Sequence, residues 1–89
     1  MVYEDLSDYP KALEYYEKSL ENKRELGDRQ GESRTLSNIG GIYLGLSDYP
    51  KALEYYEKAL TISRLIGDRF SEAGLTINIG IIYEKYSLN

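Results

Sequence analysis

The sequence predicts an all-α fold of four antiparallel helices, and three observations support this fold class. The segment Leu6–Lys18 recurs without a change at Leu46–Lys58, which is a repeat with a period of 40 residues. Within each copy the apolar residues recur at every third or fourth position, which is the spacing of one face of an α-helix. No segment shows the alternation of apolar and polar residues that is typical of a half-buried strand. Together they indicate helical hairpins in tandem.

The repeat extends well beyond the invariant segment. When residues 1–49 are paired with residues 41–89, 26 of the 49 pairs are identical. We therefore expect a single domain over 1–89, with a partial repeat unit near 1–28, a complete unit near 29–68 and a second partial unit near 69–89. A chain of 89 residues buries only a small core, so each packed face matters for its stability.

One helix type is predicted near 9–26 and again near 49–66. Ser7-Asp8 and Ser47-Asp48 precede these segments as capping residues. A proline follows in each first turn, where a missing N–H costs nothing. Gly27 and Gly67 are expected to end the two helices. The apolar stripe consists of Tyr9, Ala12, Leu13, Tyr16 and Leu20, with the equivalent residues 40 positions later.

A second helix type is predicted near 29–45 and near 69–86. Asp28 and Asp68 are expected to cap these helices. Gly40 and Gly80 fall inside them, and a glycine there costs about 1 kcal/mol relative to alanine. We therefore expect another helix to approach each glycine closely, with Ala12 or Ala52 as the small residue opposite. Residues 1–6 align with residues 41–46 and are expected to form the end of a further helix of this type.

The composition argues against several classes of function. The net charge of −4 disfavours a protein that binds nucleic-acid phosphates or anionic membranes. The chain has no Cys and no His, so it lacks the commonest nucleophile, general base and metal ligands. We expect no catalytic residues, no metal site, no cofactor and no enzymatic activity. No apolar run approaches the ~20 residues of a membrane span, and the start lacks the basic and apolar regions of a signal peptide, so a cytoplasmic location is expected.

The pattern of the central segment resembles the tetratricopeptide repeat (TPR) family. The matching residues are Leu36, Ile39, Gly40, Tyr43, Tyr49, Ala52, Tyr56, Ala59 and Leu60. The family pattern has a large residue, then Leu-Gly, Tyr, Ala, an aromatic residue and Ala at these spacings.

The chain departs from that pattern in four ways. Its period is 40 residues, whereas a typical TPR has about 34. Leu36 or Thr76 replaces the first tryptophan, Ser19 replaces one small residue, and Arg24 and Arg64 replace the closing proline. Such lengthened repeats are similar to those of the LGN/Pins polarity adaptors, of kinesin light chains and of many bacterial and archaeal arrays.

The resemblance implies a right-handed superhelix of stacked hairpins. In this family the first helix of each unit, type A, lines the concave face, and the second, type B, lies on the convex face. The four helices then follow the order B-A-B-A, with one intact A-B hairpin over 29–66. The runner-up for the fold is another α-hairpin array, such as one that binds RNA, which the acidic charge disfavours.

The resemblance also implies a protein–protein interaction scaffold that binds a peptide in its concave face. The groove-facing positions that we expect to bind the partner are Arg34, Ser37, Asn38, Gly41, Asn78, Ile81 and Lys85. In related domains an asparagine here bonds the main chain or the terminal carboxylate of a peptide, and an amide can donate and accept at once. The alternative is that each asparagine ties adjacent repeats together. Because Arg34 and Lys85 are the only cations of the set and Glu84 lies beside them, no strong preference for an acidic C-terminus is expected.

The phase of the repeats favours a second function, self-assembly. The first B helix lacks its A partner and the last A helix lacks its B partner, so each is expected to expose apolar residues. The residues that we expect to mediate self-association are Leu13, Tyr16, Leu20, Ile79, Ile82, Tyr83 and Tyr86. The result would be a dimer, a head-to-tail stack or a domain swap through one of the short Gly-Asp turns, and the alternative is a monomeric fragment with frayed ends.

Overall fold

The chain folds into four α-helices and, over the residues described, into no strand. The computed structural model describes residues 8–86. The helices are α1 (Tyr9–Leu26), α2 (Arg29–Gly45), α3 (Tyr49–Ile66) and α4 (Arg69–Tyr86). These bounds agree with the four predicted helices, and the all-α prediction is confirmed. The expected helical end over residues 1–6 lies outside the described part of the chain.

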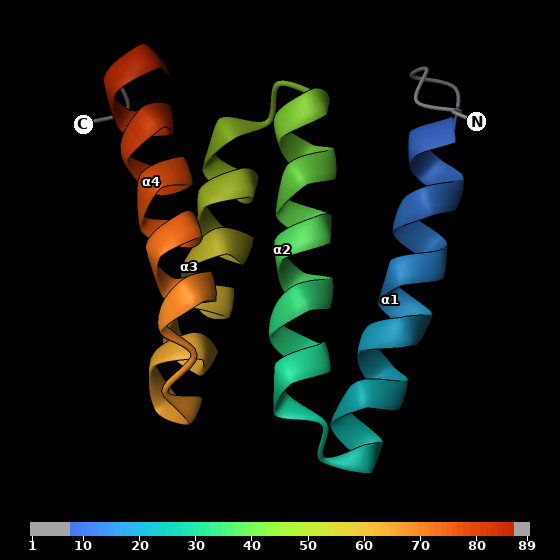
Figure 1. Cartoon of the computed structure of the whole chain (residues 1–89). Helices are drawn as coiled ribbons and strands as arrows, with labels where there is room; N and C mark the ends of the chain where they lie inside the picture. Colours follow the sequence, from blue (N-terminus) through green and yellow to red (C-terminus); the bar gives the residue numbers. More distant parts are fainter. Residues whose placement is uncertain (1–7, 87–89) are drawn as a thin grey trace.

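Each helix packs on the next one along the chain and runs in the opposite direction (Figure 1). α1 and α4 lie at the two edges of the array, and α3 lies behind α2 and α4 in this view. The most extensive contact joins α2 to α3, which form the hairpin predicted over 29–66. The chain therefore has an inner hairpin with one further helix on each side. The bounds of the repeat units stay a prediction.

The capping residues explain where most helices begin and end. Gly27 and Gly67 adopt the left-handed conformation, with φ of 71° and 73°, which costs a glycine little. At the helix starts, Asp28 Oδ1 accepts a hydrogen bond from the Gly31 N–H at 2.9 Å, and Asp68 Oδ1 accepts one from the Ser71 N–H at 3.1 Å. The expectation for Asp8 is wrong, since its side chain makes no capping hydrogen bond to α1.

A buried core joins the four helices. It contains Leu20, Leu36, Ile39, Ala52, Leu53, Tyr56, Ala59, Ile62, Leu75 and Ile82. Two buried serines add a polar link between α2 and α3. The Ser33 hydroxyl donates to the carbonyl of Ala59 at 3.0 Å and lies 3.0 Å from the Ser63 hydroxyl oxygen. Both serines are buried, and their hydroxyl groups find partners within the inner hairpin.

The two mid-helix glycines differ in their surroundings. A Cβ placed on Gly40 would lie 3.0 Å from the Tyr56 ring and 3.3 Å from the carbonyl oxygen of Ala52, so the predicted close approach is confirmed there. The same prediction is wrong for Gly80, because no atom of the described residues lies within 4 Å of the equivalent position. In the inner hairpin α3 covers Gly40, whereas none of residues 8–86 covers the corresponding face of α4.

Candidate functional site

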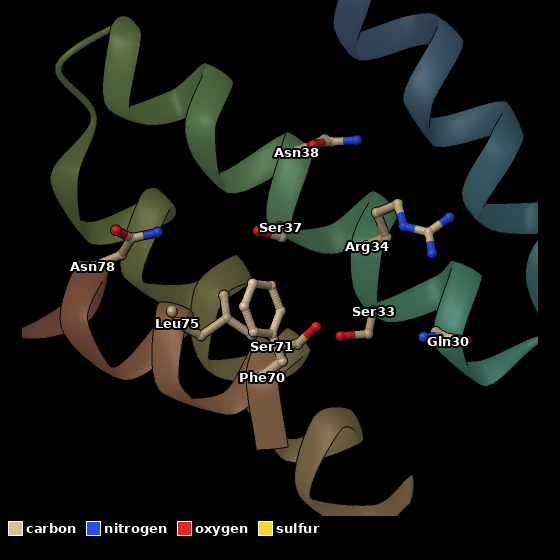
Figure 2. A pocket seen from close by; sticks show the side chains of 10 residues that line it. Gln30, Ser33, Arg34, Ser37, Asn38, Phe70, Ser71, Leu75 and Asn78 are labelled. Atoms are coloured by element: carbon tan, nitrogen blue, oxygen red, sulfur yellow. The ribbon is translucent and has the colours of Figure 1, made fainter. Parts of the chain in front are cut away.

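A hollow of about 230 Å³ lies between α2 and α4 (Figure 2). Residues of α2 form one wall and residues of α4 form the other. The lining residues are Gln30, Ser33, Arg34, Ser37 and Asn38 from α2, and Phe70, Ser71, Gly74, Leu75 and Asn78 from α4.

Helical periodicity places these side chains on one face of each helix. Residues 30, 34 and 38 are four positions apart, as are residues 70, 74 and 78, so each set follows one side of its helix. The core residues Leu36 and Ile39 occupy the opposite side of α2. Because α2 and α4 begin at equivalent positions of the repeat, Asn38 and Asn78 occupy the same position in their two helices.

The two walls differ in chemistry. The α2 wall is polar and contains the only cation of the lining, Arg34. The α4 wall contains Phe70, which is 90% exposed, and Gly74, which has no side chain where α2 has its arginine. None of the lining residues is acidic, although the whole chain has a net charge of −4. The hollow thus combines amide groups, a guanidinium group and an exposed aromatic ring.

An ionisable group, Asp68, accepts a hydrogen bond from Ser71, which lines this hollow. Hydrogen bonds from the hydroxyl and the backbone N–H of Ser71 hold the pKa of Asp68 below its ordinary value of 3.8, and the positive charge of Arg34 acts in the same direction. Asp68 is therefore ionised at neutral pH. Its carboxylate is already engaged at the start of α4.

The hollow brings together four of the seven residues predicted to bind a partner. Arg34, Ser37, Asn38 and Asn78 line it. Gly41 lines a neighbouring hollow of about 330 Å³ between α1 and α2, which Asn38 also borders.

The remaining two predicted binding residues lie elsewhere on α4. Ile81 and Lys85 are exposed but do not line the hollow between α2 and α4. They occupy the last turns of the helix, beyond Asn78. A ligand confined to this hollow would not contact them.

The set of residues predicted to bind a partner lacks six that line the hollow. These six are Gln30, Ser33, Phe70, Ser71, Gly74 and Leu75. The helical spacing indicates two of them. Gln30 lies one turn before Arg34 on the same side of its helix, and Phe70 lies one turn before Gly74. Extending the predicted stripe towards the start of each helix would have found both.

The residues predicted to mediate self-association divide into two groups. Leu13, Tyr16 and Ile79 are half-buried, whereas Tyr83 and Tyr86 are exposed. The expected exposure of the other two is wrong, because Leu20 is 8% exposed and Ile82 is 1% exposed. Both belong to the core of the chain itself, so neither is available to another molecule.

The structure shows neither a metal cluster nor a membrane-spanning helix over residues 8–86. No group of three or more acidic side chains in that range is arranged to hold a metal ion. No described helix is long and apolar enough to cross a membrane.

Comparison with known families identifies the architecture. Residues 1–65, which make up most of the chain, match the family model of the tetratricopeptide repeat. No curated protein matches the sequence. Tetratricopeptide repeats generally act as non-catalytic modules of protein–protein interaction. The 40-residue subtype stays a prediction. The match to the family model, the four consecutive antiparallel helices and the glycine packed against Tyr56 agree, and the chain belongs to the tetratricopeptide repeat family.

Proposed function

We propose that the chain is a binding scaffold that holds an extended peptide segment of a partner protein between α2 and α4. The observation that carries this proposal is the position of Asn38 and Asn78, repeat-equivalent amides that line one hollow from two neighbouring helices. Each carboxamide can donate to a peptide carbonyl and accept from a peptide N–H. Two such groups at equivalent positions suit a backbone that crosses both helices.

The other lining residues indicate which peptide side chains fit. The exposed ring of Phe70 offers an apolar surface beside Leu75. Arg34 favours an acidic side chain, because its guanidinium group can bond a carboxylate through two N–H groups. We therefore expect a ligand with an apolar residue near Phe70 and an acidic residue near Arg34.

The size of the hollow favours a peptide over a small-molecule ligand. Its volume of about 230 Å³ lies below the ~300–1,000 Å³ of usual small-molecule sites. It opens on the surface between two helices, so an extended chain can enter it with a few side chains and continue beyond it. Binding would then depend on several weak contacts along the groove.

Selection from a random peptide library displayed on phage tests this proposal. Peptides that bind the 89-residue chain would be resynthesised, and their affinities measured by fluorescence anisotropy. The Asn38→Ala/Asn78→Ala variant should bind about 5- to 150-fold more weakly, since two hydrogen bonds of about 0.5–1.5 kcal/mol each are lost. Asn22→Ala is the matched control, because Asn22 is an exposed asparagine of α1 that does not line the hollow. Unchanged affinity in the double variant for every selected peptide would exclude the groove as the binding site.

A further inference from the structure

The contact between α2 and α3 contains three paired features. Gly40 packs under the ring of Tyr56. The rings of Tyr43 and Tyr55 stack with their centroids 5.6 Å apart and their planes 18° apart. The Lys51 ammonium group lies 5.4 Å from the centroid of the Tyr43 ring. Each feature joins one residue of α2 to one of α3.

The residues of these pairs have repeat equivalents on α4 and α1, which lie at opposite edges of the array. On α4, Gly80 and Tyr83 are the repeat equivalents of Gly40 and Tyr43. On α1, Lys11, Tyr15 and Tyr16 are the equivalents of Lys51, Tyr55 and Tyr56 and lie within the invariant segment.

The solvent exposure of these residues shows that, within residues 8–86, α1 and α4 do not form these pairs. Tyr15 is 71% exposed and Tyr83 is 40% exposed. No atom of the described residues lies within 4 Å of a Cβ built on Gly80. On α1 an open hollow of about 500 Å³ is lined by Asp8, Lys11, Ala12, Tyr15 and Tyr16. The equivalent face of α3 is the one that receives Gly40 and Tyr43.

We infer that α4 of one copy of this chain binds α1 of a second copy and reproduces the contact between α2 and α3. Gly80 packs under Tyr16 of the second copy, and Tyr83 stacks on Tyr15 of the second copy. The docking continues an interface that the chain already contains, with identical residue types at these positions. This one contact accounts for both the exposed aromatic rings and the open space over Gly80.

The proposed contact between α4 and α1 of a second copy does not reproduce every residue pair of the contact between α2 and α3. In the inner hairpin this region contains the buried residues Leu36 and Ile62, and their equivalents are Thr76 and Asn22. The Ser33–Ser63 contact has no counterpart either, since Ala73 and Lys23 stand at those positions. The contact between copies is therefore apolar at one end and polar at the other. We expect it to be weaker than the contact within the hairpin.

The positions of the two faces determine the form of the assembly. α1 and α4 lie at opposite edges of the molecule (Figure 1). A contact between two different faces is heterologous, and it adds copies in a row unless the rotation closes a ring. The mean mass is therefore expected to rise steadily above 10.2 kDa with concentration, without a plateau at the dimer.

Sedimentation analysis of the 89-residue chain over a series of concentrations tests the inference. Gly80→Gln places a long side chain where Tyr16 of the second copy would lie, and should reduce the association constant at least tenfold. Gly74→Gln is the matched control, because Gly74 also lies in α4 with no atom of the described residues within 4 Å of its Cβ position. Both variants gain helix propensity, and circular dichroism confirms that each is folded.

A mixing experiment distinguishes this contact from other modes of association. Ala12→Gln blocks the face of α1, and Gly80→Gln blocks the face of α4. Each variant alone should stay monomeric, but their mixture should form a complex of about twice the chain mass, because one intact face of each kind remains. A symmetric contact through one of the two faces would not give this pattern.

A third variant tests the polar half of the contact. Asn22→Ile combined with Thr76→Leu restores the residue types of the inner hairpin and should raise the association constant at least tenfold. A mass of 10.2 kDa at every concentration up to about the millimolar range would overturn the inference. So would association that Gly80→Gln leaves unchanged, or a mixture of the two blocked variants that stays monomeric.

Discussion

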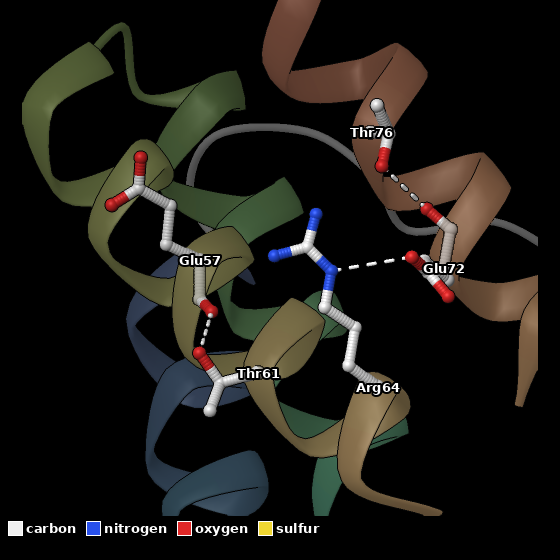
Figure 3. A network of polar contacts seen from close by, with 5 residues as sticks. All are labelled: Glu57, Thr61, Arg64, Glu72 and Thr76. Carbon is white, nitrogen blue, oxygen red and sulfur yellow. Dashed lines mark hydrogen bonds and ion pairs between the residues drawn. The ribbon is translucent and has the colours of Figure 1, made fainter. Parts of the chain in front are cut away.

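Arg64 Nε donates a hydrogen bond to Glu72 Oε2 at 3.2 Å and so joins the end of α3 to the start of α4 (Figure 3). The same link recurs between α1 and α2, where the Arg24 Nε and Glu32 Oε2 atoms lie 3.0 Å apart. Each arginine lies in the last turn of its helix and each glutamate in a first turn, where the helix dipoles favour these charges. The two ion pairs therefore link the helices on either side of two equivalent turns, α1–α2 and α3–α4.

The two ion pairs should differ in strength because their carboxylates differ in exposure. The side chain of Glu32 is 14% exposed, whereas that of Glu72 is 35% exposed. Exposed pairs typically contribute about 0.2–1 kcal/mol, and less screening by water strengthens a pair. Double-mutant cycles with alanine, read by urea denaturation, should give the larger coupling energy for Arg24–Glu32. Equal couplings, or the reverse order, would show that exposure does not decide the strength of this link.

The left-handed glycine at the end of α3 gives a second prediction. No atom of the described residues lies within 4 Å of a Cβ built on Gly67, so a substitution there changes backbone strain and not packing. Gly67→Ala should lower the free energy of unfolding by about 1 kcal/mol, because alanine disfavours a φ of 73°. Gly67→Asn is the control and should cost less, since asparagine tolerates this conformation. Thermal denaturation measures both, and an equal loss in the two variants would contradict the conformational explanation.

The depressed pKa of Asp68 predicts how stability changes in acid. Hydrogen bonds from Ser71 favour the ionised carboxylate in the folded chain, so the folded pKa lies below the unfolded value near 3.8. The stabilisation is therefore complete above about pH 5, one unit above the unfolded pKa, and is lost as the pH falls through the folded pKa. Asp68→Asn keeps a capping oxygen without a titratable group. The melting temperature of the wild type should exceed that of the variant near neutral pH, and the difference should shrink below about pH 5. A difference that stays constant with pH would show that the charge of Asp68 does not contribute.

The sequence was sufficient to predict the four helices because their ends are marked locally. Pro10, Gly27, Pro50 and Gly67 act within one helical turn, so their effect needs no tertiary information. The two helix types and the close approach at Gly40 followed from the repeat and from the mid-helix glycine.

The hollow between α2 and α4 was harder to predict, because it depends on which side of each helix faces the other in the folded chain. The spacing places Phe70 on the same side of α4 as Gly74 and Asn78, but the pattern of α4 alone does not show that this side borders a hollow shared with α2. The sequence pattern does not distinguish Leu20 and Ile82 from the other apolar residues of their stripes. Their burial follows from a rotation of each helix that only the packed structure fixes.

Alanine should change the free energy of unfolding in opposite directions at the two repeat-equivalent glycines, Gly40 and Gly80. Gly40→Ala adds a methyl group 3.0 Å from the buried ring of Tyr56 and 3.3 Å from a backbone oxygen of α3, and neither neighbour can move freely. The crowding should cost about 1–3 kcal/mol, which outweighs the gain of about 1 kcal/mol in helix propensity. Gly80→Ala meets no atom of the described residues within 4 Å, so only the gain remains, and the free energy of unfolding should rise by up to about 1 kcal/mol. Urea denaturation at low protein concentration, where copies do not associate, measures both. Destabilisation by Gly80→Ala under these conditions would show that another part of the same chain covers that face of α4.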